Sequence, residues 1–138
     1  MNIEEFRDFC LAFKGVTEEF PFDEETLVFK VMGKIFALAG VDNFDSVNLK
    51  CDPELALELR EKYPGVKPGY HMNKKHWNTV MVNAGISDQL IKEWTRHSYE
   101  LVVAGLPLKI RKELENQGKR RTETGDREPL RDREPLSR

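Results

Sequence analysis

The 138-residue sequence has only two cysteines, no apolar run long enough to span a bilayer, and no basic-then-apolar leader. Cys10 and Cys51 form no CxxC pair and stand among apolar neighbours, so we expect reduced thiols in a core. A membrane span needs about 20 apolar residues. The start of the chain carries Glu4, Glu5 and Asp8 and lacks the pattern of an export signal. We therefore expect a cytoplasmic protein with no membrane association.

Motifs for catalysis and nucleotide binding are also missing. Neither GxxxxGK[ST] nor GxGxxG occurs, and no serine stands in a glycine-flanked elbow. Neither cysteine has a recognisable basic partner. His71 and His76 are five positions apart, but Lys74 and Lys75 between them would repel a cation, so no metal site is expected. The sequence predicts a protein that is not an enzyme and has no cofactor.

Charge is unevenly distributed along the chain. Its length suits one domain, and its net charge is −2 with a pI near 6.0. Residues 1–26 contain eight acidic and two basic side chains, whereas residues 62–80 contain four lysines and no acid. The acidic overall balance opposes strong non-specific DNA binding, because such binding depends on many cation–phosphate contacts. A local basic site remains compatible with this composition.

Local signals predict a first helix and a three-stranded meander. Apolar residues three to four apart follow Asn2, which forms a capping-box pattern with Glu5, and Gly15 closes the helix. Glu18 to Glu25 are typical of a solvated acidic loop. Gly33-Lys34 fits a two-residue hairpin turn between the first two strands. The strands are expected at 26–32, 35–41 and 44–51.

Capping signals predict the second half of the chain. Asp52-Pro53 starts a second helix, and Ser87 caps a third helix that Gly105 interrupts. Two more strands, near 69–72 and over 77–82, lie between these helices, and Pro107 begins a last short helix. The expected fold is α+β, with an antiparallel sheet covered on one face by helices and the element order α-β-β-β-α-β-β-α.

Composition changes after the last expected helix. From Gln117 onward apolar periodicity stops, and the sequence Asp-Arg-Glu-Pro-Leu occurs twice. Polar, repetitive segments of this kind cannot form a packed core. We therefore predict a domain over residues 1–116 and a disordered charged tail over residues 117–138.

The aromatic residues divide into expected core and open cases. We expect Phe6, Phe13, Phe29 and Trp94 in the core. Phe20 and Phe22 flank Pro21 and are expected to staple the first helix to the sheet. Tyr63, Tyr70 and Trp77 suit a core edge or a binding groove equally, because Tyr and Trp combine an apolar body with a polar tip.

The segment over residues 63–80 is the strongest functional signal. It contains two Pro-Gly corners, two histidines and three lysines, without any Asp or Glu. Proline presets φ and glycine accepts positive φ, so these corners fix turns. The segment predicts a small positive surface with aromatic stacking faces, suited to an anion, a peptide or a nucleic acid.

Its run Pro-Gly-Tyr-His-Met-Asn-Lys-Lys-His-Trp, over residues 68–77, resembles the MmcQ/YjbR family. Other parts of the same pattern are Glu19-Phe20-Pro21-Phe22, residues 28–31, Gly33-Lys34, residues 49–51, Trp94 and residues 98–102. The resemblance covers roughly residues 1 to 110. It implies a small bacterial α+β protein with a CyaY-like (frataxin-like) or secretion-chaperone-like sheet and a "double wing" DNA-binding motif.

The resemblance also implies a contact surface. Hairpins near Gly33-Lys34 and residues 73–75 would be the wings, with lysines on phosphates and an aromatic ring on an exposed base. The expected contact residues are Lys34, Lys50, Lys67, Tyr70, His71, Asn73, Lys74, Lys75, His76 and Trp77. With so few cations, DNA binding should be weak and salt-sensitive. The alternative is a chaperone-like module that holds a protein partner on its open sheet face. The oligomeric state is expected to be a monomer or weak dimer.

Overall fold

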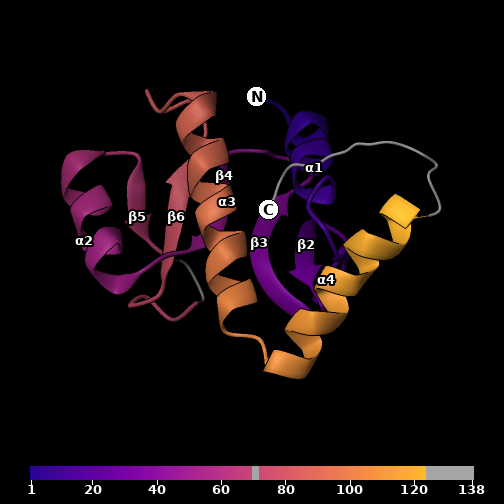
Figure 1. Ribbon diagram of the computed structural model, residues 1–138. Coiled ribbons are helices and arrows are strands. Elements are labelled where there is room, and N and C mark those ends of the chain that lie inside the picture. The colour runs from indigo at the N-terminus through magenta and orange to yellow at the C-terminus, as the bar shows by residue number, and fades with distance from the viewer. Residues whose placement is uncertain (70–71, 124–138) are drawn as a thin grey trace.

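The computed structural model describes residues 1–69 and 72–123, with side chains as far as Gln117. Its elements are α1 (Ile3–Leu11), β1 (Val16–Glu19), β2 (Thr26–Val31), β3 (Lys34–Gly40), β4 (Ser46–Lys50), α2 (Pro53–Lys62), β5 (Val66–Pro68), β6 (Trp77–Met81), α3 (Asp88–Ala104) and α4 (Leu108–Glu123). The strands form one antiparallel sheet in the order β1-β2-β3-β4-β6-β5. In Figure 1, α3 crosses in front of the sheet, α2 lies beside β5, and α4 lies toward the β2 side. The predicted α+β fold is confirmed.

Local caps start the helices where the sequence predicts. Asn2 Oδ1 accepts from the backbone N–H of Glu5 at 2.8 Å, and the Glu5 carboxylate accepts from the backbone N–H of Asn2 at 3.0 Å. The side chains of Asp52 and Ser87 each accept from the backbone N–H three residues on, at 3.2 and 3.1 Å. Each cap satisfies donors that the first helical turn leaves unpaired.

The core lies between the sheet and the helices α1 and α3. Alternation along β4 turns Val47 and Leu49 toward the helices, and α3 contacts β2, β3 and β4. An irregularity in the β2–β3 register leaves Phe36 without a partner of its own on β2, and Phe36 is fully buried. Its ring packs edge-on against Tyr99 of α3 at 5.4 Å between centroids. The two cysteines are buried and unpaired, as predicted.

The sheet has one more strand than the predicted order contains. Val16–Glu19 forms the edge strand β1, so part of the expected acidic loop is paired with β2. Ion pairs hold this strand: Glu18 accepts from Arg7 of α1 at 2.6 Å, and Glu19 accepts from Lys30 of β2 at 2.8 Å. The sequence does not predict this strand, because acidic residues are typical of loops. The partners that neutralise these charges come together only in the folded chain.

The first hairpin turn is shifted by one residue from its predicted position. Met32 and Gly33 form the turn, with φ of 49° and 86°, and Lys34 is already the first residue of β3, opposite Val31. Two successive positive φ angles match the twist that a tight hairpin needs. Residues that favour a positive φ are glycine, asparagine and aspartate, so a methionine at position 32 gives no signal in the sequence that the turn begins there.

The expectation for Phe20 and Phe22 is wrong. Both side chains lie in the 20–25 loop between β1 and β2 and are 49% and 67% exposed. The contact between α1 and the sheet edge is made instead by the Arg7–Glu18 ion pair. The chain leaves the sheet after Glu19, before it reaches either aromatic ring.

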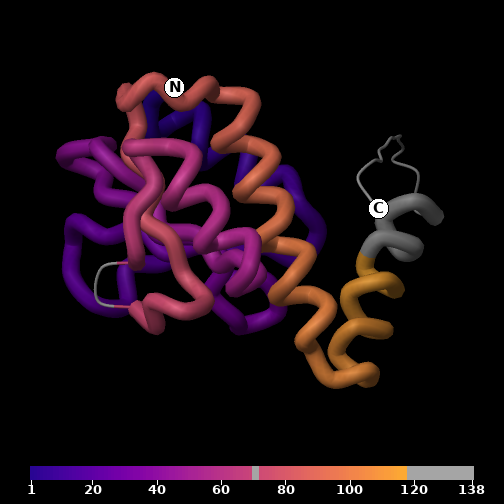
Figure 2. The backbone as a smooth tube through the Cα atoms, turned by 90° about the vertical axis from the view of Figure 1, so that its left-hand side faces the viewer, coloured from indigo at the N-terminus to yellow at the C-terminus, as the bar shows by residue number. Residues whose placement is uncertain are grey.

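Later elements follow the prediction with shifted bounds. The fourth predicted strand is Val66–Pro68 rather than 69–72, and Tyr70 and His71 lie outside the described residues. Trp94 is half-buried and packs edge-on against Tyr63, at 5.2 Å between ring centroids, at the edge of the core. The boundary expected at residue 116 stays a prediction, since α4 continues to Glu123 and residues 124–138 lie outside the described ranges. In Figure 2 the coloured part of α4 stands at the side of the molecule, and Leu114 of this part is buried in the core.

Candidate functional site

The predicted contact residues within the described chain gather at one end of the sheet. β4 ends there at Lys50, directly opposite Trp77, where β6 begins. β5 ends at the same end with Lys67 and Pro68, and the 69–76 connection follows it. Lys34 reaches this end from the start of β3. The antiparallel order therefore brings together residues that are more than 40 positions apart in the sequence.

Lys50, Trp77 and Lys67 share the sheet face that points away from the helices. Lys50 and Trp77 are opposite each other, and Lys67 is opposite Thr79, two residues along from Trp77 on the same face. A diagonal neighbour of this kind is roughly 7–8 Å away. Trp77 thus has a lysine on each neighbouring strand. We call Lys50, Lys67, Lys74, Lys75 and Trp77 the lysine–tryptophan surface.

Lys34 is placed apart from that surface. It is opposite Val31, which is fully buried on the helix-covered side, so Lys34 starts from the other face of the sheet. Lys34 and the lysine–tryptophan surface share an end of the sheet but not a face. The structure therefore does not bring the two expected wings together on one side.

The connection before β6 is shaped by its own backbone. The backbone N–H of Lys75 donates to Asn73 Oδ1 at 2.9 Å, and that of His76 donates to the Asn73 carbonyl at 3.1 Å. The half-buried His76 in turn accepts at its own carbonyl from Cys51 N–H at 2.7 Å. Lys74 and Lys75 are exposed at the tip. Asn73 uses its side-chain oxygen within the turn, while the two lysines project into solvent.

Arg60 of α2 holds this connection from the helix side, and sequence reasoning missed it. Its Nε donates to Asn78 Oδ1 at 2.7 Å, and its Nη2 donates to the carbonyls of Lys74 and, at 3.2 Å, Trp77. Asn78 is buried and reaches back to the Ala56 carbonyl of α2 at 3.5 Å. The only signal in the sequence is a basic residue in the last turn of a helix, which is common.

Gly69 explains why a Pro-Gly corner precedes the turn. Its backbone N–H donates to the Trp77 carbonyl at 2.9 Å, and a Cβ at this position would lie 2.8 Å from Trp77 Cβ. Only glycine allows the two backbones to approach this closely. The corner therefore sets the position of Trp77 relative to the end of β5.

The chemistry of the described residues does not include a poised nucleophile. Burial raises the pKa of Cys51 to about 11 and that of Cys10 well above its ordinary value, so both thiols stay protonated at neutral pH. Within residues 1–69 and 72–123, no three His, Cys, Asp or Glu side chains are grouped as metal ligands. No helix in that part of the chain is long and apolar enough to cross a membrane.

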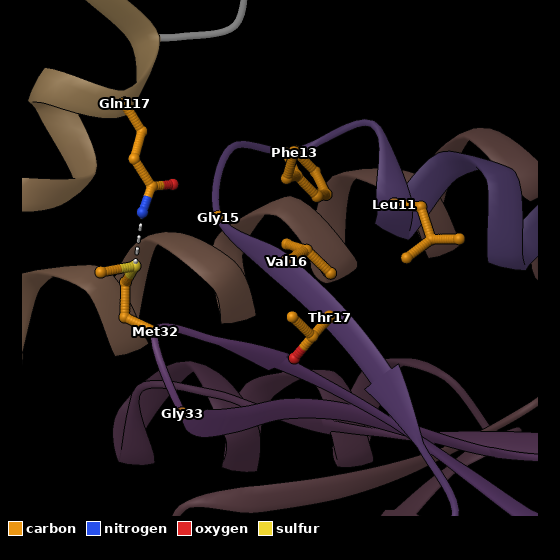
Figure 3. Close-up of a pocket in the computed structure, with 8 residues that line it drawn as sticks. All are labelled: Leu11, Phe13, Gly15, Val16, Thr17, Met32, Gly33 and Gln117. Carbon is orange, nitrogen blue, oxygen red and sulfur yellow. Dashed lines mark hydrogen bonds between the residues drawn. The ribbon is translucent and has the colours of Figure 1, made fainter. Parts of the chain in front are cut away.

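A cavity of about 360 Å³ lies between the end of α1, the β2–β3 turn and α4 (Figure 3). Gln117 Nε2 points at Met32 Sδ across its mouth, at 3.8 Å. The lining residues are Leu11, Phe13, Gly15, Val16, Thr17, Met32, Gly33 and Gln117. None of these side chains ionises near neutral pH, so they supply no acid–base pair.

Comparisons with known proteins agree with this architecture. The YjbR family model matches residues 11–101. The chain is 43% identical to Escherichia coli O157:H7 YbdF over 95 residues, 68% of this chain and 78% of that one. It is 36% identical to E. coli K12 YjbR over 115 residues, 83% and 98% of the two chains. None of these names states an enzymatic activity.

Solved structures give the same result. A crystal structure of a Deinococcus radiodurans protein with the DUF419 domain superposes with a TM-score of 0.77 at 40% identity, covering 82% of this chain and 87% of that one. A Pseudomonas syringae protein superposes with a TM-score of 0.62 at 29% identity, covering 73% and 98%. The family match spans most of the chain, and these relatives share its fold, so the chain belongs to the YjbR family.

Proposed function

We propose that this protein binds nucleic acid weakly through the lysine–tryptophan surface. The observation that carries the proposal is the placement of Lys50 and Lys67 on either side of Trp77, on one sheet face. Exposed Lys74 and Lys75 extend the same positive end. Lysines are suited to phosphates, and a tryptophan ring is suited to stacking on a base.

The surface is preorganised for such a contact. Arg60 and the Asn73 turn fix the backbone that carries Lys74 and Lys75. Binding therefore costs less ordering entropy than it would in an unstructured loop. Four lysines neutralise few phosphates, so affinity is low and falls steeply with salt. Lys34 lies on the opposite face of the sheet from the lysine–tryptophan surface. A duplex that contacted both would therefore have to lie across the end of the sheet.

The open sheet face offers less to a protein partner. One row across it runs through Lys67, Thr79, Asn48, Leu38, Val28 and Glu19. Val28 is fully buried and Leu38 is 6% exposed, so the apolar residues of this row are already covered. A chaperone-like grip on apolar segments needs exposed apolar surface. This supports nucleic acid over a protein segment as the ligand of this face.

Fluorescence anisotropy with labelled single- and double-stranded DNA, at low and moderate salt, tests the proposal. We expect Lys50→Ala/Lys67→Ala and Lys74→Ala/Lys75→Ala each to weaken binding. Each lysine lost should reduce the log–log salt slope by about 0.9 for duplex or 0.7 for single strands. Lys109→Ala/Lys112→Ala on exposed positions of α4 is the matched control.

Three results would count against the proposal. Equal affinity of native protein and both surface variants would remove the lysine–tryptophan surface as the site. An equal loss in the α4 control would mean that only net charge matters. Loss of binding only in a chain that ends at Gln117 would assign binding to the C-terminal segment instead.

A further inference from the structure

Two exposed phenylalanines stand at the end of the sheet opposite the lysine–tryptophan surface. Phe20 and Phe22 are 49% and 67% exposed, and neither belongs to the apolar residues packed on the core. Their loop, residues 20–25, leads into Thr26, and Thr26 begins β2 at the end where β3 finishes with Gly40. β6 begins at Trp77 and finishes at Met81 on this opposite end. Two large aromatic side chains are thus presented to solvent rather than to the core.

The loop that presents them is held in shape. Asp23 Oδ1 accepts from the backbone N–H groups of Glu25 and Thr26, at 2.8 and 2.7 Å. These two hydrogen bonds hold the pKa of Asp23 below its ordinary value. On the side of β1, the Glu19–Lys30 ion pair at 2.8 Å fixes the strand that enters the loop. The aromatic side chains therefore project from a fixed turn, which lowers the entropic cost of using them in a contact.

The loops at this end of the sheet carry several acidic side chains and no basic ones, while the nearest cations, Lys30 and the N-terminal ammonium, are paired with Glu19 and Asp88. Loops 20–25, 41–45 and 82–87 meet at this end. The Val41 N–H donates to the Glu25 carbonyl at 2.9 Å, and the Val82 N–H donates to the Asp45 carbonyl at 2.8 Å. These three loops contain no lysine or arginine. Their exposed carboxylates belong to Asp23, Glu24, Glu25, Asp42 and Asp45. An apolar ligand that binds the two rings must approach through a negative field.

We propose that the 20–25 loop is a docking site for a cationic, amphipathic protein segment. Apolar side chains of the segment pack on Phe20 and Phe22, and its lysines or arginines pair with the surrounding carboxylates. Charge complementarity selects this partner, because the same carboxylates repel nucleic acid and anionic lipid surfaces. The site goes beyond the proposed nucleic-acid contact and lies at the other end of the sheet, so both can be occupied together.

A synthetic helical peptide of leucine and lysine, labelled with a fluorophore, is the probe. We expect Phe20→Ser/Phe22→Ser to weaken its binding to the full chain by about tenfold or more, as loss of aromatic anchors does at other interfaces. Leu57→Ser/Leu108→Ser is the matched control, because these side chains are 59% and 58% exposed elsewhere on the surface. A serine–lysine peptide of the same charge should bind at least tenfold more weakly than the leucine peptide.

Further measurements keep the result interpretable. Urea unfolding should give both double variants stabilities close to that of the native chain, since neither pair is buried. In NMR titrations, amide shifts should cluster in residues 20–25 and 41–45, and DNA should not displace the peptide. Equal peptide binding by the native chain and the phenylalanine variant would overturn the proposal. So would equal binding of the two peptides, shifts centred on Lys74 and Lys75, or self-association of the chain that the phenylalanine variant abolishes.

Discussion

Arg60 Nε donates to the buried Asn78 Oδ1 over 2.7 Å, joining α2 to β6 beneath the turn that carries Lys74 and Lys75. The same guanidinium binds two backbone carbonyls of that turn region. One side chain therefore couples the position of a helix to the conformation of the candidate binding site.

Arg60→Ala should lower the free energy of unfolding by about 2 kcal/mol, because it leaves Asn78 Oδ1 and the Lys74 carbonyl without the Arg60 donor. The Trp77 carbonyl loses one of its two donors and keeps the Gly69 N–H. Urea unfolding measures the change, and the Lys75 amide should lose hydrogen-exchange protection. Glu61→Ala, exposed on the same helix, should change stability by less than about 0.5 kcal/mol. Unaltered exchange at Lys75 in the Arg60 variant would mean that the turn holds itself.

Ser98→Ala should be more harmful than Thr95→Val, although both hydroxyls are fully buried on α3. Ser98 Oγ donates to the Phe36 carbonyl at 2.5 Å and accepts from Lys50 N–H at 2.9 Å, so its loss removes a partner from two strands. Among the described residues, the Thr95 hydroxyl bonds only the Ile91 carbonyl of its own helix, at 2.7 Å. We expect a cost of about 1–3 kcal/mol for Ser98→Ala and less for Thr95→Val. Equal costs in thermal or urea unfolding would contradict this.

Gly33→Ala should destabilise the chain by about 1 kcal/mol. A Cβ there meets no atom within 4 Å, so the cost comes from the backbone, whose φ is +86°. Gly105→Ala is the comparison, since φ there is −87° and the nearest atoms allow a methyl group. That change should be neutral or slightly stabilising, and a loss equal to that of Gly33→Ala would exclude a φ-based explanation.

Both thiols should react slowly with a disulfide reagent at pH 8 in the native chain and rapidly in urea. Burial blocks access of the reagent and, by raising the thiol pKa, keeps both groups protonated. Burial raises the pKa of Cys51 to about 11. In the unfolded chain the Cys51 thiol ionises nearer pH 8.5. Its burial therefore leaves the stability of the folded chain unchanged below about pH 8.5, and the chain becomes less stable as pH rises from there toward 11. Cys51→Ala should flatten the fall in stability over that interval. Fast native labelling at pH 8 would show that Cys51 is accessible.

Features with local causes were predictable from the sequence. Asn2, Asp52 and Ser87 start helices because each side chain accepts from a backbone N–H only three residues away. The meander follows from alternation, which is also local. The basic character of the 63–80 segment is likewise visible, since no acid interrupts it.

Features that depend on distant partners were not predictable. β1 is a strand because it pairs with β2, and its glutamates are neutralised by Arg7 and Lys30, neither of which is adjacent in the sequence. The importance of Arg60 depends on acceptors 14 to 18 positions further along. Phe20 and Phe22 were expected to staple the first helix to the sheet because they flank Pro21 near its start, whereas their loop lies beyond the end of the sheet and both rings are exposed.

The two outer strands of the sheet have a consequence for colloidal behaviour. Within the described residues, β1 and β5 each pair with one neighbouring strand and form the two edges of the sheet, the positions at which strands from other molecules could add. β5 is three residues long and contains Lys67 and Pro68, and β1 carries Glu18 and Glu19. Charge, brevity and a missing N–H all oppose fibril-like stacking. Lys67 thus places a charge on the β5 edge, and we expect its removal to make the chain more prone to aggregate at high concentration.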